Sequence, residues 1–403
     1  LYNFDIKRPK DKGQKLNFDM IAKDFIERRL KLYNILPKNS IAVVYARDIL
    51  QRSPTIPYRF NQFSDYLYLT GQNRPSGALI MCTKNNSLFC SLFLPQLTEE
   101  EEKWSVLSTT KFDDALKTSG VDSVLPLSEF SGWLSNYISK NPTHTIFSSL
   151  PPHQSSKYPF RLLSSYIDRI RVIKSPKEIE LMKKASNITQ QALSKVLTTI
   201  KPGIYERQIA ARFEDTCINL GATGLAYPVE CQSGSNALCL HYIENNCILK
   251  EGETLLVDAG CEYENYASDF SRTVPIGNVK PSIAAALQIV ENTKNDLIKS
   301  VKSGKLTTLN EINEETQKIL LKGLLELGIK TDINGVSQYF PHKASHWIGL
   351  DVHDSKYVDG NFKLQKGCAF SIEPGLYFRP SIKDCPKELV GLGIRFEDTV
   401  IID

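Results

Sequence analysis

The sequence predicts an α/β N-terminal domain followed by an α+β C-terminal domain. The chain has 403 residues, which is too long for one compact core and fits two domains. Short apolar runs alternate with helical stretches in the first part, whereas long amphipathic helices and strands that carry carboxylates fill the second part. We therefore expect domains at residues 17–165 and 166–403, preceded by a mobile polar arm at residues 1–16.

The N-terminal domain opens with an amphipathic helix at residues 17–36, where apolar residues recur at helical spacing before Pro37. A second helical stretch is expected at residues 113–118. The polar, proline-containing stretch 148–158 is typical of a region between domains. Short apolar runs predict strands at residues 41–45, 66–69, 78–82 and 88–93.

The C-terminal domain begins with a clear helix signal. Ser175-Pro176-Lys177-Glu178 has the pattern of a capping box with proline at the first helical position, and Lys201-Pro202-Gly203 ends this helix. Further apolar periodicity predicts helices at residues 205–220, 282–300 and 308–327. Apolar runs predict strands at residues 253–259, 266–274, 369–372 and 393–402.

Composition and charge exclude several classes of protein. The formal net charge is +4 and no stretch of lysine and arginine is dense, so nucleic acid is not an expected partner. No apolar run approaches the roughly 18 residues that a membrane span needs. Nine scattered cysteines without a C-x-x-C pair favour reduced thiols in a cytosol-like or matrix-like compartment. The chain starts at Leu1, and we expect that an upstream segment was removed.

Two aspartates lie in neighbouring apolar strands of the second domain. Asp258 is near the end of one apolar run, residues 260–265 supply turn material, and Asp269 follows on the next strand. A hairpin of this kind brings both side chains to one side. Either aspartate alone could instead cap a turn or lie on the surface. A charge inside the apolar stretch 255–259 is costly, however, unless a partner or a metal holds it.

Histidines and glutamates gather in the segments that follow. Of the chain's six histidines, His342, His346 and His353 fall close together in one short segment. A single buried histidine is more often a core residue than a ligand, and that interpretation stays open for His342. Glu373 and Glu397 each lie in or at the end of an apolar strand.

These residues form a hard, oxygen-rich set of metal donors. Two divalent cations would neutralise four carboxylates, and oxygen-rich ligation favours manganese, with cobalt or zinc as alternatives. Two such ions can lower the pKa of a shared water and so produce a nucleophile. The sequence therefore predicts a two-metal hydrolase. Its predicted metal ligands are Asp258, Asp269, His346, Glu373 and Glu397.

The motifs around these residues resemble the pita-bread metallopeptidases, and within them aminopeptidase P. Similar segments are 240–245, which puts His241 at the family's substrate-side histidine, and 345–354, 373–377 and 391–398. The N-terminal domain is similar through residues 57–71, so the resemblance covers about residues 17–403. It implies a pita-bread catalytic domain behind an aminopeptidase P-like N-terminal domain. One departure is Lys343-Ala344, where the family usually has a small residue after the first histidine.

The resemblance also implies a role for each residue of the site. Asp258 would bind one metal and His346 and Glu373 the other, while Asp269 and Glu397 would bridge both. Glu373 would also move the proton of the attacking water. His241 and His353 would hold the scissile carbonyl and the developing oxyanion, which makes them catalytic as well as substrate-binding. His342 and Arg395 complete the expected substrate-binding set, although Arg395 could instead only pair with the acidic ligands.

Several alternatives share this fold. Methionine aminopeptidases usually lack the N-terminal domain, and prolidases are less similar around Trp347 and residues 58–71. A catalytically silent peptide-binding protein would typically lose metal ligands, and this chain keeps all five. We expect removal of one N-terminal residue from polypeptides, as in the mitochondrial intermediate-cleaving branch, with the matrix as compartment. A general or cytosolic Xaa-Pro aminopeptidase is the alternative. The resemblance implies a homo-oligomer, dimer or tetramer.

Overall fold

A computed structural model describes residues 18–84, 86–104, 112–150, 159–383 and 385–403. The predicted arm at residues 1–16 and most of the predicted inter-domain stretch lie outside these residues. The chain divides into two compact units, Leu1–Ile170 and Arg171–Asp403. The boundary expected between residues 165 and 166 falls slightly before this division.

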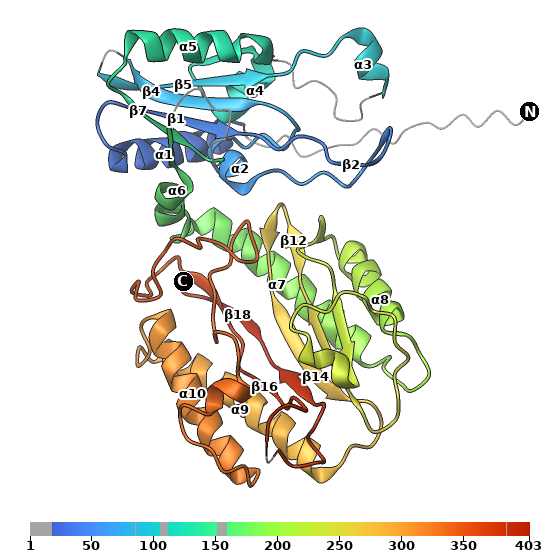
Figure 1. The fold of residues 1–403 in the computed structure, drawn as a ribbon. Helices are drawn as coiled ribbons and strands as arrows, with labels where there is room; N and C mark the ends of the chain where they lie inside the picture. The colour runs from blue at the N-terminus through green and yellow to red at the C-terminus, as the bar shows by residue number, and fades with distance from the viewer. Residues whose placement is uncertain (1–17, 85, 105–111, 151–158, 384) are drawn as a thin grey trace, which may run out of the picture. The chain divides into compact units, whose positions relative to one another are not determined.

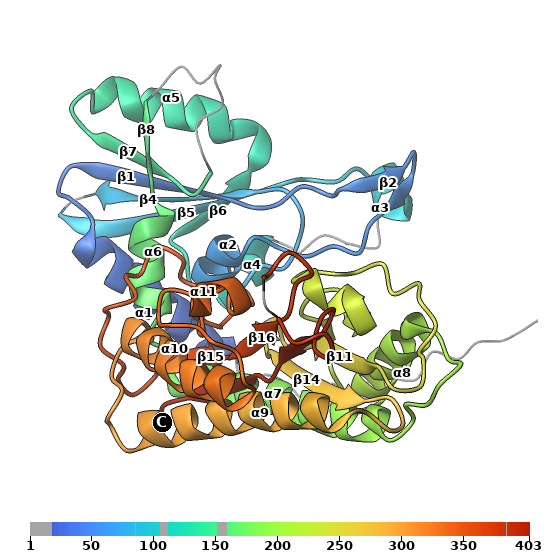
Figure 2. The ribbon, with the colours of Figure 1, turned by 60° about the horizontal axis from the view of Figure 1, so that its bottom comes forward.

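The first unit is built on a six-stranded mixed sheet in the order β6-β5-β4-β1-β7-β8 (Figure 1). Helix α5 covers one face of the sheet, and α1, α2 and α4 lie on the other (Figure 2). The apolar face under α5 includes Ile41, Val43 and Phe93, which pack with Leu134 of the helix. The strands are β1 (Ser40–Tyr45), β4 (Ala78–Lys84), β5 (Ser87–Leu94), β6 (Ser123–Pro126), β7 (Thr145–Ser148) and β8 (Phe160–Leu162).

The other elements of this unit are short, apart from the first helix. A small hairpin, β2 and β3, extends from the sheet (Figure 1). These elements are α1 (Phe18–Ile35), β2 (Gln51–Ser53), β3 (Ile56–Pro57), α2 (Ser64–Thr70), α3 (Glu99–Trp104), α4 (Phe112–Ser119), η1 (Leu127–Glu129), α5 (Phe130–Lys140) and α6 (Ser164–Arg171). The predicted helices at 17–36 and 113–118, and the strands at 41–45, 78–82 and 88–93, are confirmed.

The strand predicted at residues 66–69 is wrong, because this stretch belongs to helix α2. Most of the helix is buried, so its apolar run has no visible period, and periodicity cannot separate a buried strand from a short buried helix. Gly71 ends the helix in the left-handed conformation, with φ of 68°, and its N–H donates to the Leu67 carbonyl at 2.8 Å. A β-carbon at Gly71 would lie only 2.3 Å from the Phe25 ring.

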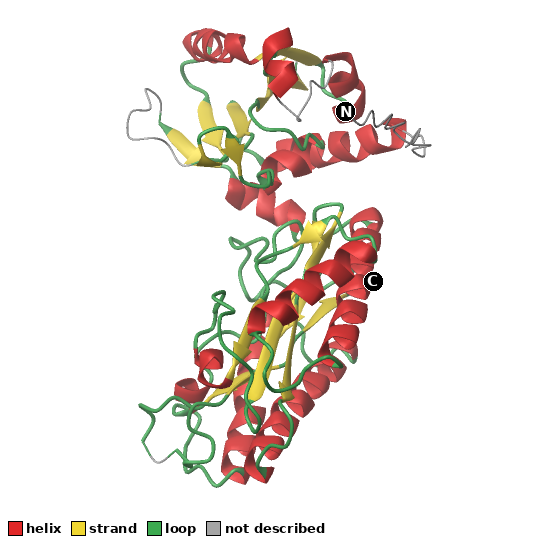
Figure 3. Cartoon of the chain, turned by 90° about the vertical axis from the view of Figure 1, so that its right-hand side faces the viewer, coloured by secondary structure: helices red, strands yellow, loops and turns green. Residues whose placement is uncertain are grey.

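In the second unit, long helices cover one face of the strands and loops cover the other (Figures 2 and 3). The Ser175 hydroxyl accepts from the Glu178 N–H, and the Glu178 carboxylate accepts from the Ser175 N–H, which confirms the capping box. The predicted helices at 205–220, 282–300 and 308–327 are also confirmed. The helices are α7 (Pro176–Leu197), α8 (Glu206–Asn219), α9 (Pro281–Lys302), α10 (Leu309–Glu326) and α11 (Val336–Tyr339), with the 3₁₀ turn η2 (Gly234–Leu238).

The strands of the second unit pair in small sheets rather than in one continuous sheet. Two sheets have three strands, β10-β11-β14 and β13-β12-β9, and two are pairs, β15-β18 and β16-β17. The strands are β9 (Gly224–Leu225), β10 (Glu230–Ser233), β11 (Thr254–Ala259), β12 (Cys261–Tyr263), β13 (Tyr266–Ala267), β14 (Phe270–Pro275), β15 (Ala369–Ile372), β16 (Gly375–Tyr377), β17 (Gly393–Arg395) and β18 (Asp398–Ile401).

Two predicted strands are therefore interrupted. The run 266–274 breaks between β13 and β14, and the run 393–402 breaks between β17 and β18. At each break the chain changes its pairing partner, since β13 pairs with β12 but β14 pairs with β11. Likewise β17 pairs with β16 and β18 with β15.

A search of the helices within the described residues finds none that has both the length and the apolar character to cross a membrane.

Candidate metal centre and substrate site

A cavity of about 260 Å³ lies in the second unit and gathers the predicted site residues. It is partly open to solvent, and most of its lining residues are ionisable. Its lining residues are Leu240, His241, Asp258, Asp269, His342, Lys343, Ser345, His346, His353, Glu373, Arg395 and Glu397. Every residue that the sequence assigned to metal binding, catalysis or substrate binding therefore faces one space.

Three of the four carboxylates lie where strands break. Asp269 separates β13 from β14, Glu373 separates β15 from β16, and Glu397 separates β17 from β18. The backbone N–H of Asp269 donates to the Thr399 hydroxyl at 2.9 Å, and that of Glu397 donates to the Ser271 carbonyl at 3.0 Å. Because these N–H groups leave the regular ladder but stay hydrogen-bonded, each side chain is directed into the cavity at little cost to the backbone.

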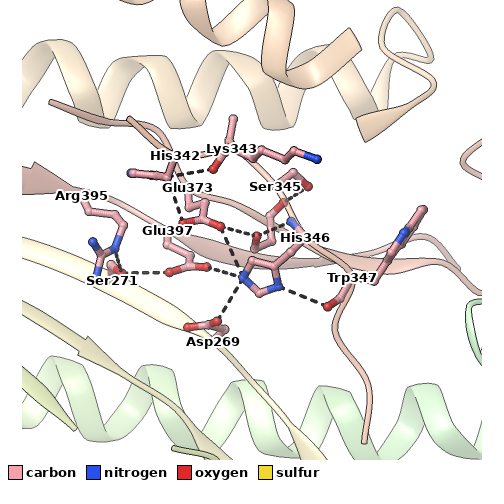
Figure 4. A network of polar contacts seen from close by, with 12 residues as sticks. Asp269, Ser271, His342, Lys343, Ser345, His346, Trp347, Glu373, Arg395 and Glu397 are labelled. Carbon is pink, nitrogen blue, oxygen red and sulfur yellow. Dashed lines mark hydrogen bonds and ion pairs between the residues drawn. The ribbon is translucent and has the colours of Figure 1, made fainter. Parts of the chain in front are cut away.

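His346 lies at the centre of the carboxylate cluster (Figure 4). Its Nε2 is 3.4 Å from Asp269 and from Glu373, and 3.7 Å from Glu397. Its Nδ1 lies 3.2 Å from the Trp347 carbonyl, which can only accept, so Nδ1 carries a proton. Asp269, His346 and Glu397 each offer a donor atom within 4.8 Å of the others.

Asp258 is held beside this cluster by two partners. The Tyr227 hydroxyl lies 2.7 Å from Asp258 and 2.5 Å from Asp269, so its single proton is shared between the two carboxylates. Arg395 donates from Nη2 to Asp258 at 2.5 Å and from Nε to the Ser271 hydroxyl at 3.0 Å. Asp258 therefore pairs with an arginine, whereas Asp269, Glu373 and Glu397 have His346 as their common partner.

A second chain of hydrogen bonds runs from Arg395 to His342. Arg395 Nη1 donates to the Tyr377 hydroxyl at 2.8 Å, and that hydroxyl lies 3.0 Å from His342 Nε2. His342 Nδ1 donates to the Lys343 carbonyl at 2.8 Å, so Nε2 accepts. Burial, together with the charge of Arg395, lowers the pKa of His342 to about 3, which keeps this ring neutral. The unusual residue Lys343 is exposed at the cavity lining.

The two histidines expected at the substrate lie near each other. The ring centroids of His241 and His353 are 6.3 Å apart, and those of His346 and His353 are 4.5 Å apart. Among the described residues, neither His241 nor His353 forms a hydrogen bond or ion pair with a carboxylate, so both rings are available to a ligand at the cavity. Burial lowers the pKa of His353, which favours its neutral form.

The crowded carboxylates perturb one another strongly. Burial raises the pKa of Glu373 to about 7, against the attraction of His346 and Arg395. Burial and the charge of Asp269 raise the pKa of Glu397 well above its usual range. Burial opposes a charge on His346 too, but its contacts with Asp269 and Glu397 raise its pKa. Buried carboxylates that lie this close together can all be ionised only if cations lie beside them.

These residues fit divalent metal ions. Glu397 is 2% exposed, and its Oε1 is a buried oxygen without a hydrogen-bond partner in the described part of the chain. An unpaired buried carboxylate oxygen is costly, whereas a cation among Asp269, His346 and Glu397 would satisfy it. The Trp347 carbonyl fixes the His346 tautomer so that Nε2 faces this position, as is usual for a metal-binding histidine.

The sequence analysis missed three side chains that shape the site. Tyr227 links two aspartates, Ser271 donates to Glu397 Oε2 at 2.9 Å, and Glu230 lies 3.7 Å from Arg395. Burial and the charge of Asp258 raise the pKa of Glu230 to about 8. Glu230 begins β10, whose four residues are all buried but mostly polar, so no apolar run marks this strand in the sequence.

Comparison with known proteins identifies the family. Residues 180–403 match metallopeptidase family M24, and residues 25–147 match the N-terminal domain of aminopeptidase P. The chain belongs to metallopeptidase family M24. This member of family M24 is a metalloaminopeptidase of the aminopeptidase P type, and membership implies a divalent metal. The expected pita-bread fold and the expected resemblance are confirmed.

Two relatives illustrate the range of this family. The chain is 33% identical to the mitochondrial intermediate cleaving peptidase 55 of Arabidopsis thaliana, over 94% of this chain and 78% of the relative. It is 32% identical to human Xaa-Pro aminopeptidase 3, over 94% of this chain and 81% of the relative.

Solved structures agree with this assignment. The structure of Icp55 from Saccharomyces cerevisiae has a TM-score of 0.83 and 28% identity, covering 94% of this chain and 91% of that one. Aminopeptidase P from E. coli, solved with the inhibitor Pro-Leu, has a TM-score of 0.82 and 27% identity, covering 94% and 92%.

Proposed function

We propose that this aminopeptidase uses two divalent metal ions, manganese first, to remove a single N-terminal residue from polypeptides. The observation that carries the metal proposal is the convergence of Asp269, His346 and Glu397 around a buried, unpartnered glutamate oxygen. Glu373 and Asp258 would complete the ligand set from either side, since Glu373 lies 3.4 Å from His346 and Tyr227 links Asp258 to Asp269.

Bound divalent ions supply Lewis-acid polarisation of the scissile carbonyl and acidify a water. The side chains of the cavity would do the rest. Glu373 is placed to take a proton from the attacking water and to deliver it to the leaving amine, because its Oε1 faces His346 and Ser371 while Oε2 faces His342. His241 and His353 would donate to the carbonyl oxygen as negative charge develops on it.

Arg395 has a supporting role in this proposal. The side chain is 4% exposed, and its guanidinium donates to Ser271, Tyr377 and Asp258. It would hold Asp258 ionised and orient Tyr377, which in turn presents its hydroxyl to His342. This favours the ion-pair role for Arg395 over direct contact with substrate.

We further propose that the enzyme trims imported precursors in the mitochondrial matrix after their presequences are removed. The similarity to the Arabidopsis intermediate cleaving peptidase 55 supports this proposal, since it extends over 94% of this chain. The second candidate is cleavage before proline, which the similarity to human Xaa-Pro aminopeptidase 3 favours. We also propose a homo-oligomeric assembly, dimer or tetramer.

A peptide digest separates the two candidates. Peptides that begin with Tyr, Leu or Phe are paired, one with proline and one with alanine at the second position, and incubated with the manganese-loaded enzyme. Release of the first residue from the alanine peptides supports precursor trimming. Release from the proline peptides alone supports an Xaa-Pro aminopeptidase. Release from neither member of any pair contradicts the proposed function.

A further inference from the structure

We infer that Glu206 is a positioning residue that holds His241 at the cavity by anchoring the segment 234–247. This inference rests on the proposed role of His241 in holding the substrate carbonyl. Glu206 is the first residue of α8 and lies outside the cavity lining, so it is distinct from the ligands and from the residues that would meet substrate.

The Glu206 carboxylate is fully buried, at 0% exposure, and accepts five hydrogen bonds. Its Oε1 accepts from the Ser233 N–H at 2.7 Å, the Ser233 hydroxyl at 2.7 Å and the Asn236 amide at 3.0 Å. Its Oε2 accepts from the Tyr242 hydroxyl at 3.0 Å and the Cys247 N–H at 2.9 Å. One side chain thus joins the start, the middle and the end of the segment.

Other hydrogen bonds hold the segment mainly towards its two ends. The backbone N–H groups of Glu206 and Arg207 donate to the Cys247 and Asn245 carbonyls, and Arg379 donates to the Leu238 carbonyl at 3.2 Å. The segment forms only the short turn η2, and Ala237 alone is buried among residues 234–247, all of which the structure describes. His241 itself is exposed to the cavity. Asn245 secures the far end by bonding Val229 and Cys231, but Tyr242 is the neighbour of His241. The Tyr242 hydroxyl lies 3.0 Å from Glu206 and 3.1 Å from the Asn246 amide oxygen, and on the other side of His241 the Leu240 carbonyl accepts from Gln232 at 3.5 Å. The contact of Tyr242 with Glu206 therefore ties the chain beside His241 to the buried carboxylate.

The donors also fix the charge of Glu206. Burial alone would raise its pKa, but the hydrogen bonds from Ser233, Asn236 and Cys247 outweigh burial and lower it. A carboxylate has acceptor sites at both oxygens, whereas a glutamine amide has only one accepting oxygen. In Glu206→Gln the hydroxyls can rotate, but the amide NH₂ must face either the Cys247 N–H or the Ser233 N–H. At least one backbone donor then loses its partner.

Hydrogen exchange on the full chain tests the anchor without reference to activity. We expect the amides of residues 239–247 to exchange at least about tenfold faster in Glu206→Gln, the effect of losing one buried hydrogen bond. The matched control is Glu178→Gln. Glu178 is also buried, at 4% exposure, and bonds Ser175 and Tyr266, but it does not touch the segment. Equal exchange of residues 239–247 in the two variants would overturn the inference.

A double-mutant cycle with His241 tests the positioning role. If Glu206 acts through His241, Glu206→Gln should lower kcat/KM about tenfold in the wild-type background and hardly at all in His241→Ala. Equal losses in both backgrounds would show a general structural role and overturn the inference. Should Glu206→Gln fail to fold, Tyr242→Phe removes one bond from the same carboxylate and must show the same two effects. An inactive wild type would contradict the proposed function. The hydrogen-exchange result alone would then show whether Glu206 holds the segment 234–247 in place.

Discussion

The surroundings of Glu397 indicate that a cation binds beside this residue. Its Oε2 accepts from Ser271, yet its Oε1, 3.7 Å from His346 Nε2, is buried without a hydrogen-bond partner among the described residues. A buried carboxylate oxygen without a partner is costly unless a cation neutralises it. The pKa values of Glu373 and Glu397 are raised, as is that of Glu230 beside Arg395, so acidic groups are in excess around the proposed metal position.

Replacing one ligand should remove activity but keep the fold. We expect Glu373→Ala and Asp269→Ala to abolish turnover in a manganese-supplemented assay, because the loss of one carboxylate unbalances the metal pair and the water that it activates. Circular dichroism should remain close to that of the wild type. Asp296→Ala is the control, because Asp296 is an exposed partner of Lys299 and should leave turnover unchanged. Substantial residual turnover in either ligand variant would contradict the assignment.

His353 should matter less than a metal ligand. We expect His353→Ala to lower kcat by about 10²–10³, the size of one lost transition-state hydrogen bond, with metal content unchanged. Its ring centroid lies 4.5 Å from that of His346, but the ring forms no hydrogen bond with a carboxylate in the described part of the chain. Steady-state kinetics and metal analysis of the same preparation measure both quantities. A loss of metal together with the loss of rate would make His353 a ligand rather than an oxyanion donor.

The site residues that could be predicted from the sequence are those that lie within recognisable motifs. Every residue assigned to the site lines one cavity. The metal ligands were assigned from carboxylates and histidines in apolar segments, whereas His241 and the substrate-binding roles were assigned from the family resemblance. Tyr227 and Ser271 could not be found in this way. A neutral tyrosine or serine costs little when buried with a partner, so its sequence position carries no sign of the contact that it makes.

At the scale of elements, the breaks in the strands produce the site. Asp269, Glu373 and Glu397 each follow a strand whose successor pairs with a different partner. Apolar periodicity predicted the runs 266–274 and 393–402 as single strands, because apolar residues continue on both sides of each break. The break depends on bonds to distant residues, such as that from the Asp269 N–H to Thr399, and these are not visible in a local pattern.

Gly260 lies where the backbone at Ser268 and the ring of Tyr227 pack closely against it. A β-carbon at this residue would lie 1.8 Å from the Ser268 carbonyl oxygen and 2.9 Å from the Tyr227 ring. We expect Gly260→Ala to lower the free energy of unfolding by about 1–3 kcal/mol, since backbone must move to make room. The same substitution at Gly132 of α5 meets nothing within 4 Å and should be neutral or slightly stabilising. Denaturant unfolding compares the two, and equal stabilities would contradict the packing argument.

For the whole molecule, the division into two units and the α/β and α+β classes followed from the order of helices and strands. The predicted substrate followed from resemblance, and the compartment from resemblance together with the scattered cysteines and the start at Leu1. No side chain in the cavity encodes a compartment, and none shows whether proline is required after the first residue. These properties depend on the partner polypeptide and on cellular address rather than on the packing of this chain.

The proposed cellular role predicts that loss of the enzyme leaves the N-termini of its substrates one residue longer. In cells that lack this enzyme, we expect a subset of mitochondrial proteins to keep N-termini one residue longer than in normal cells. Mass spectrometry of N-terminal peptides from both cell types measures this directly. If deletion lengthens no mitochondrial N-terminus, precursor trimming is wrong and the Xaa-Pro alternative takes its place.

The number of metal ions bound per chain tests the proposed two-metal centre directly. The purified full chain is equilibrated with manganese, freed of unbound ions and analysed by elemental mass spectrometry beside Glu397→Ala. We expect about two manganese ions per wild-type chain, because two divalent cations neutralise four carboxylates. The variant should retain clearly fewer ions. A wild-type chain that retains no manganese, or a variant that retains as much as the wild type, would contradict the two-metal centre.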